Sequence, residues 1–494
     1  MAVKYVVSQD VNVPISLAMA ENKATNYAQH GISVWATGLL LTGELAGAGM
    51  VALPQAVQFM GSIVGVLMLL LCALLCGYCG ILLGTCWSML QARIPQYREH
   101  CKRPYQEIGR VACGAWMTHV VSVTIDLTLF GTCVSYLVLA ASSIHSLLVS
   151  WFDLNITFCL FLVILTVCLL PLTFLGSPKD FWQAVVLAMI CTTIAFVIII
   201  IGMAIDDKDG VTSSSPANSS NGSTPTTTQL PSSDDPMRGF DLFFLAFGVI
   251  IFAYTGHSVF PTIQQDMKEP LKWNWAILMA FILQLLYYIP ISLIGSFVYG
   301  DQTKDSIMSN LGVEWANTSS KLLITFHVLF SFILMINPVS QELEHIFKVP
   351  HKFCLKRVAV RTVLVLAILF VAESIPNFGV MVSLIGGTGS SLLALVYPPV
   401  FYYQLKKKFA KDDEDKVAYF IGSNKLRPVE GATRKEKLIQ PAHWFVCIIL
   451  VIIIAIGIFT TLASTYSSLK TMIYPGPGDA FVSPCYVDPS VGMS

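Results

Sequence analysis

Two ionisable residues stand inside long apolar segments of this chain, each beside residues that interrupt a helix. Glu44 precedes a Gly-Ala-Gly stretch at 47–49, and His257 directly follows a glycine. A carboxylate or imidazole buried in an apolar segment is costly and usually functional, because it can take up a proton or pair with a ligand. The small residues allow non-helical turns and let a ligand approach the main chain. The sequence therefore predicts sites where free main-chain groups and titratable side chains meet.

The first interrupted segment runs from Gly43 to Pro54. We expect a new half-helix to begin near Met50, with Pro54 early in it. The free N–H groups of this half-helix suit an anion such as a carboxylate. The last carbonyls of the preceding half-helix, near Leu41 and Thr42, suit a cation or an ammonium group, and the two ends together match a zwitterionic α-amino acid. The residues expected to bind this ligand here are Gly43, Gly47, Ala48 and Gly49. The alternative is a seam of small residues for helix packing.

The second interrupted segment runs from Phe252 to Pro261 and brings several polar groups to one depth. Gly and Pro interruptions at matching places in two halves of a membrane protein are a sequence indication of a binding site. Pro261 fits a short half-helix that ends toward 264–266. The residues expected to contact the ligand in this segment are Phe252, Tyr254, Thr255 and Ser258.

Three residues are candidates for carrying a proton: Glu44, His257 and Asp126. Burial favours the neutral form of a carboxyl group, so Glu44 is able to gain and lose a proton as water access changes. The alternatives are structural: Glu44 as a hydrogen-bonded strut, and His257 as a cap on the break. Thr132 and Tyr136 are expected to line the same pocket. His327 and Ser331 share a helix face, and His327 is interpreted as a packed residue.

The composition indicates an all-α membrane protein. The chain of 494 residues is 55% hydrophobic and 12% charged, whereas soluble domains carry about 25% charged residues. Apolar runs recur near the ~20 residues that a spanning helix needs. We expect eleven transmembrane helices, near 33–58, 61–85, 118–148, 155–175, 181–204, 240–265, 274–298, 320–346, 358–374, 379–404 and 442–465.

Basic residues predict the orientation. If residues 1–32 form a cytoplasmic tail, 25 of the 30 Lys and Arg residues fall on the cytoplasmic side, as the positive-inside tendency requires. The C-terminal segment 466–494 is then extracellular or lumenal. The sequons at Asn218, Asn221 and Asn317 fall on the outer side and are candidate glycosylation sites. The tail shows no pattern of a cleavable signal peptide.

The cysteines predict neither an outer disulfide nor a metal site. Twelve of the 13 are assigned to spans or cytoplasmic loops, and Cys485 is the one placed on the outer side. We therefore expect no outer intrachain disulfide, and a packing role for span cysteines such as Cys159. No His and Cys spacing predicts a metal site.

The two interrupted segments open two sets of five spans. The sets cover 33–204 and 240–404 and are separated by an outer loop at 205–239. Because five is odd, the second set starts from the opposite side of the membrane, which makes an inverted repeat natural. A charged cytoplasmic loop at 405–441 and an eleventh span at 442–465 follow.

Three motifs resemble the amino acid/auxin permease family. Residues 247–268 are similar to its sixth-span signature, residues 375–399 to its second signature, and Gly47-Ala48-Gly49 with Leu53-Pro54 to its first-span turn. The stretch 260–264 most resembles vesicular inhibitory amino acid transporters and related invertebrate amino acid transporters. The resemblance covers roughly residues 33–465.

The resemblance implies an eleven-span LeuT-like fold and secondary active transport of amino acids. The expected activity is proton-coupled transport of small neutral amino acids by alternating access. A sodium-coupled carrier of the same fold stays open, as does a receptor that binds an amino acid and signals through segment 405–440. Many members carry a neutral residue where Glu44 stands, which leaves the substrate charge open. We expect no enzyme activity, no cofactor beyond the coupling ion H⁺ or Na⁺, no nucleic acid and no obligate protein partner; the partners are the amino acid and the lipid bilayer.

Overall fold

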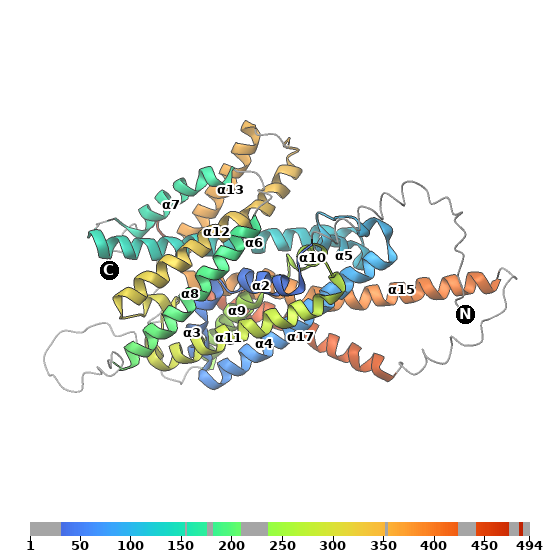
Figure 1. Ribbon diagram of the computed structural model, residues 1–494, viewed down its shortest axis with the longest axis horizontal. Coiled ribbons are helices and arrows are strands. Elements are labelled where there is room, and N and C mark those ends of the chain that lie inside the picture. The colour runs from blue at the N-terminus through green and yellow to red at the C-terminus, as the bar shows by residue number, and fades with distance from the viewer. Residues whose placement is uncertain are drawn as a thin grey trace, which may run out of the picture.

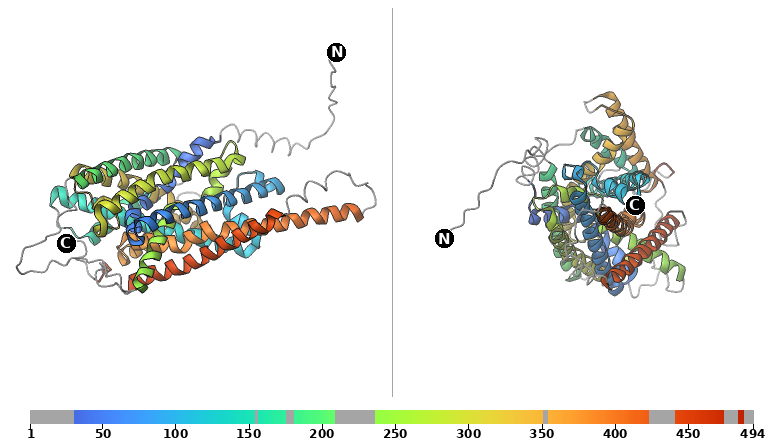
Figure 2. Two further views of the ribbon diagram at one scale, coloured as in Figure 1. Left: turned by 90° about the horizontal axis from the view of Figure 1, so that it is seen from below. Right: turned by 90° about the vertical axis from the view of Figure 1, so that its right-hand side faces the viewer.

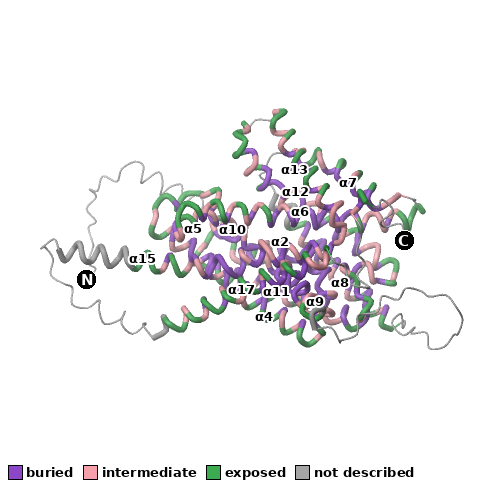
Figure 3. Tube along the Cα trace, turned by 180° about the vertical axis from the view of Figure 1, so that it is seen from behind, coloured by how far each residue is buried: buried purple, intermediate pink, exposed green. Residues whose placement is uncertain are grey.

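The computed structural model describes residues 31–153, 156–174, 181–208, 236–350, 354–422, 441–473 and 484–487. Within these residues the chain is helical and contains no strand; the extended residue Ile32 forms one parallel bridge with Met267. The long helices run side by side along the long axis of the molecule (Figure 1, Figure 2). Buried residues gather in the middle of this bundle, around α2, α9 and α11 (Figure 3).

The helices follow the order of the expected spans. Their bounds are α2 Val34–Leu45, α3 Ala48–Met60, α4 Ser62–Arg93, η1 Pro95–Arg98, α5 Pro104–Cys113, α6 Ala115–Phe152, α7 Phe158–Thr173, α8 Phe181–Lys208, α9 Pro236–Tyr254, α10 Phe260–Gln265, η2 Pro270–Lys272, α11 Trp273–Tyr299, η3 Gly300–Gln302, η4 Ile307–Ser309, α12 Glu314–Ile346, α13 Leu355–Ser374, α14 Phe378–Ile385, η5 Gly386–Ser390, η6 Leu392–Val396, α15 Tyr397–Gly422 and α17 Pro441–Ile473. The segments η5 and η6 are π-helical and interrupt the tenth expected span, which the sequence did not predict.

The ends of the helices have identifiable local causes. Gly61 and Gly114 adopt positive φ of 81° and 102°, which separates α3 from α4 and α5 from α6, and glycine takes this conformation without a Cβ penalty. Ser33, Thr157 and Asn377 cap α2, α7 and α14 by accepting hydrogen bonds from main-chain N–H groups of the first turns.

Seven helices among the described residues are long and apolar enough to cross a membrane, or eight if the bent pair α2–α3 is one span. The helices α7 and α9 are apolar but shorter. The structure therefore confirms a multi-pass helical membrane protein, while the count of eleven spans stays a prediction. The amphipathic helix α5, between α4 and α6, was not expected from the sequence.

The expectation that Cys485 forms no intrachain disulfide is wrong. Cys159 and Cys485 form a disulfide that links α7 to the C-terminal segment 326 residues away. The reason is that α7 begins at Phe158, so Cys159 lies at the helix end and not within the span. The Cys485 N–H also donates to the Glu373 carbonyl at 2.9 Å, and Tyr486 stacks on Phe370 with ring centroids 6.1 Å apart. The C-terminal segment thus ties α7 to the end of α13.

This disulfide can be tested by thiol labelling. Because Cys159 is oxidised in the native protein, a maleimide applied to the purified protein in detergent is expected to leave it unmodified. In Cys485→Ser, peptide mapping by mass spectrometry should find Cys159 labelled. Equal labelling of Cys159 in the unreduced native protein and in the variant would exclude the bond.

Of the candidate glycosylation sites, Asn218 and Asn221 lie outside the described residues. Asn317 lies in the first turn of α12, where its side-chain amide donates to the Leu311 carbonyl at 3.0 Å. Glycosylation at any of the three stays a prediction.

Candidate functional site

The first interruption lies between α2 and α3, as predicted. The two helices are bent by 61° at this break, where Gly47 adopts φ −100° and ψ −122°. A Cβ on Gly47 would collide with Nε2 of His327 on α12, so the packing at the break requires glycine. Helix α3 begins at Ala48, earlier than expected, and Pro54 is therefore inside it and not in its first turn.

The second interruption lies between α9 and α10, also as predicted. Helix α9 ends at Tyr254, and α10 begins at Phe260 with Pro261 in its first turn. Between them the chain makes short turns, in which the Thr255 N–H donates to the Phe252 carbonyl at 3.2 Å. Such interrupted main chain at membrane depth must be enclosed by protein, water or a ligand.

The two breaks lie next to each other. Helix α3 packs against α9, and a Cβ on Gly49 would stand 2.7 Å from the Cα of Ala253. Gly256 similarly faces Leu45, the last residue of α2. The interrupted main chains of two segments about 200 residues apart in sequence therefore meet directly.

A single side chain of α11 joins both breaks. The Tyr288 hydroxyl lies 3.0 Å from the Leu45 carbonyl and 2.8 Å from the Ala253 carbonyl, and it is fully buried. These carbonyls lie at the C-terminal ends of α2 and α9, where helix carbonyls lack intrahelical partners. One hydroxyl carries one hydrogen, so Tyr288 donates to the two acceptors in turn or shares its hydrogen between them. The sequence analysis missed Tyr288, because no pattern distinguishes it from the neighbouring Tyr287.

Tyr288→Phe is expected to loosen both breaks. Removing the hydroxyl leaves a buried carbonyl without a donor, at a cost of about 1–3 kcal/mol. We expect a lower thermal unfolding midpoint in detergent. Tyr287→Phe is the matched control, since Tyr287 contacts Thr193 on α8 at 3.2 Å and neither break. Equal effects of the two substitutions would contradict this role.

A small cavity lies between the breaks, with a volume of about 40 Å³. This is room for about three water molecules, so a larger ligand requires its walls to move. The cavity is lined by Glu44, Leu45, Gly49, Thr128, Leu129, Thr132, Tyr136, Phe252, Thr255, Gly256, Ser258, Val259, Met335 and Ser390. Its walls come from both interrupted segments and from α6, α12 and η5.

Several residues chosen from the sequence meet at this cavity. They are Glu44, Gly49, Thr132, Tyr136, Phe252, Thr255 and Ser258. The Glu44 carboxyl group forms no hydrogen bond or ion pair with any residue that the structure describes, although the side chain is half-buried. Thr128, Met335 and Ser390 also line the cavity and were not selected from the sequence.

The other substrate candidates lie elsewhere. Gly43 packs against Met189 of α8, and Gly47 against His327. Ala48 is buried and is not among the lining residues. Tyr254 is fully buried, with its ring stacked on Phe281 at a centroid distance of 5.9 Å.

Two of the three proton candidates face away from the cavity. The His257 ring contacts the Cys76 carbonyl of α4 at 3.0 Å and packs on Phe260 with centroids 4.6 Å apart. Asp126 is on α6, within electrostatic range of the ion pair that Arg103 and Glu342 form at 2.6 Å. Glu44 is the one proton candidate among the lining residues.

His327 is packed, as interpreted, and it also makes polar contacts with α8. Its Nδ1 lies 2.9 Å from the Thr192 hydroxyl and 3.2 Å from the Ala188 carbonyl, both on α8. Because a carbonyl only accepts, this contact requires Nδ1 to carry a hydrogen. His327 thus links α8, α12 and the first break, outside the cavity.

These features define a multi-pass helical membrane protein with a polar cavity at two interrupted helices. The chain belongs to the family described as transmembrane amino acid transporter protein, whose pattern matches residues 30–421. This is a family of transporters and not of enzymes.

Curated relatives include plant amino acid transporters from Arabidopsis thaliana. The chain is 26% identical to amino acid transporter AVT1C over 374 residues, which is 74% of this chain and 62% of that protein. It is 26% identical to AVT1E over 79% of this chain and 69% of that protein. It is also 26% identical to AVT3A, over 74% of this chain and 79% of that protein. The matched region thus spans about three fifths of AVT1C and more of the other two.

Among solved structures, the chain is similar to a manganese transporter of Eremococcus coleocola, with 13% sequence identity and a TM-score of 0.45. The alignment covers 89% of this chain and 95% of that one.

Proposed function

We propose that this protein is a secondary active transporter of small neutral amino acids that works by alternating access. The proposed architecture has eleven spans in a LeuT-like fold, with an inverted repeat of residues 33–204 and 240–404 and one additional helix. The observation that supports this best is the cavity between two interrupted helices, which contains the unpaired carboxyl group of Glu44. Membership of the amino acid transporter family supports the class of substrate.

The ends of the half-helices supply groups for a zwitterion. Helix α3 begins at Ala48 beside the cavity, and its first N–H groups are suited to an α-carboxylate. The carbonyls at the end of α2 are suited to the α-ammonium group. Gly49 and Gly256 let the ligand approach the main chain.

We propose H⁺ as the coupling ion and Glu44 as the group that carries it. A carboxylate inside a membrane protein without a partner is unfavourable, so an empty carrier gains stability when Glu44 is protonated. His257 and Asp126 are weaker candidates because neither lines the cavity. Sodium coupling is the alternative outcome of the test below.

We propose that residues 1–32 are cytoplasmic and that residues 466–494 are extracellular or lumenal. The Cys159–Cys485 disulfide supports this orientation, because disulfides persist in extracellular and secretory compartments and are rare in the cytosol. The membrane is the plasma membrane or that of a vesicle or endolysosome.

The test is uptake of radiolabelled glycine, alanine and serine into proteoliposomes that contain the purified protein. With choline in place of sodium, an inward proton gradient is expected to stimulate uptake and a protonophore to remove the stimulation. Uptake that needs sodium and ignores the proton gradient would exclude proton coupling. Absence of uptake under every ion condition would exclude the carrier function.

A further inference from the structure

We propose that the cavity requires one positive charge opposite Glu44, and that a cationic amino acid side chain supplies it in place of the proton. The site would then carry small amino acids with a side-chain ammonium group without a coupled proton, and neutral ones with a proton. This inference rests on the proposed carrier function and adds a second class of substrate.

The first argument is the charge of the cavity wall. Glu44 is the only Asp, Glu, Lys, Arg or His among the lining residues, and it has no hydrogen-bond or ion-pair partner in the described part of the chain. A buried carboxylate that lacks a partner carries a desolvation cost of several kcal/mol. Closing the cavity around a neutral zwitterion therefore leaves a net negative charge unless Glu44 is protonated.

The second argument is the direction of the hydroxyl hydrogens. Three threonines of the wall donate to main-chain carbonyls of their own helices: Thr128 to Thr124 at 2.7 Å, Thr132 to Thr128 at 2.8 Å, and Thr255 to Ile251 at 2.5 Å. A hydroxyl has one hydrogen, so these three oxygens are left to the cavity as acceptors.

The wall thus holds three acceptor oxygens besides the Glu44 carboxylate. An ammonium group carries three hydrogens and accepts none, so it can meet the carboxylate and such acceptor oxygens together. A terminal methyl group provides neither charge nor hydrogens, so it leaves the carboxyl group to be neutralised by H⁺. Protonation of Glu44 and binding of a side-chain ammonium group both supply one positive charge when the cavity closes. The two differ in whether a proton crosses the membrane with the substrate.

The test uses an isosteric pair of substrates in sodium-free proteoliposomes. Norvaline and 2,4-diaminobutyrate have the same number of non-hydrogen atoms, and a terminal ammonium group in the second replaces a methyl group in the first. A pH-sensitive dye inside the vesicles reports proton entry during uptake of each radiolabelled compound. We expect norvaline uptake to acidify the interior, and 2,4-diaminobutyrate uptake to proceed without acidification and without dependence on the gradient.

The outcomes separate this inference from the proposed function. If neither norvaline nor any other small neutral amino acid is carried, the carrier function itself fails. If norvaline is carried with protons and 2,4-diaminobutyrate is not carried, or carries the same number of protons, the inference is overturned.

Glu44→Gln provides the second arm, because glutamine keeps the shape and removes the charge. The ratio of 2,4-diaminobutyrate to norvaline exchange is expected to fall at least tenfold in this variant, and an unchanged ratio would contradict the role of Glu44. Glu269→Gln is the control, since Glu269 is an exposed acidic residue that pairs with Lys272 at 2.8 Å and does not line the cavity; its ratio should stay at the native value. If Glu44→Gln does not fold, the native protein's proton measurements decide alone.

Discussion

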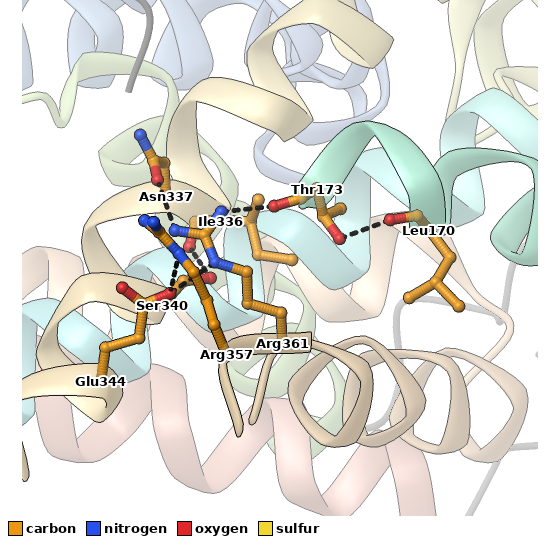
Figure 4. A network of polar contacts seen from close by, with 8 residues as sticks. All are labelled: Leu170, Thr173, Ile336, Asn337, Ser340, Glu344, Arg357 and Arg361. Atoms are coloured by element: carbon orange, nitrogen blue, oxygen red, sulfur yellow. Dashed lines mark hydrogen bonds and ion pairs between the residues drawn. The ribbon is translucent and has the colours of Figure 1, made fainter. Parts of the chain in front are cut away.

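Replacing Glu344 by alanine is expected to destabilise the protein by about 3–5 kcal/mol, the cost of leaving a buried charge without its partner. Glu344 accepts hydrogen bonds from Arg357 at 2.9 Å and from Arg361 at 2.6 Å. The Arg361 side chain is only 2% exposed, and it also donates to the Thr173 carbonyl and to Asn337 (Figure 4). The network joins α12, α13 and α7, so its loss affects three helices together.

The matched control is another glutamate in an ion pair. Glu269 pairs with Lys272 at 2.8 Å, and both side chains are more than half exposed, so Glu269→Ala should cost less than about 1 kcal/mol. Thermal unfolding in detergent measures both variants. A midpoint shift for Glu344→Ala as small as that for Glu269→Ala would show that the buried arginines are solvated or paired by other groups.

Gly386→Ala is expected to lower stability by about 3 kcal/mol or more, at the upper end of the range for overpacked cores. A Cβ at this position would overlap the carbonyl oxygen of Gly248 and lie 2.9 Å from the main-chain nitrogen of Phe252. These are backbone atoms of α9, which cannot rotate away as a side chain can. Because Phe252 lines the cavity, the shift should also raise the KM for substrate.

Gly239→Ala is the control for this substitution. Gly239 is also in α9, and a Cβ there would meet no atom within 4 Å. Alanine favours helix over glycine by up to about 1 kcal/mol, so this variant should be as stable as the native protein or slightly more stable. Equal losses in the two variants would contradict the close contact between α9 and η5.

Much of the architecture could be predicted from the sequence. Long apolar runs determine where helices pass through a membrane, and a cluster of small residues with a proline shows where a helix is interrupted. Both breaks, and the meeting of Glu44 with Thr255 and Ser258, were therefore accessible before the structure was known.

The missing details concern how each helix is rotated. Depth along a span follows from residue number, but in a segment that is apolar on all sides nothing indicates which neighbour a side chain faces. For that reason His257 was expected near the cavity and instead contacts Cys76. His327 is packed, as interpreted, but its contact with the first break was not predicted. Tyr288 was not selected for the same reason.

Helix ends were the other source of error. An uncertainty of a few residues at the start of α7 moved Cys159 from a helix end into a span, which hid its disulfide with Cys485. The π-helical turns of η5 and η6 have no periodicity that an apolar sequence reveals.

The most direct test of the central claim is whether an amino acid occupies the cavity between the two breaks. Ser258→Cys places a thiol in the cavity wall, and its rate of modification by a small methanethiosulfonate reagent can be measured with and without saturating alanine. Gln302→Cys, at an exposed position in η3, reports any general effect of alanine on the reagent. We predict that alanine slows modification at position 258 at least tenfold and leaves position 302 unchanged. Full reactivity at position 258 under alanine concentrations that saturate uptake would contradict a substrate site between the interrupted helices.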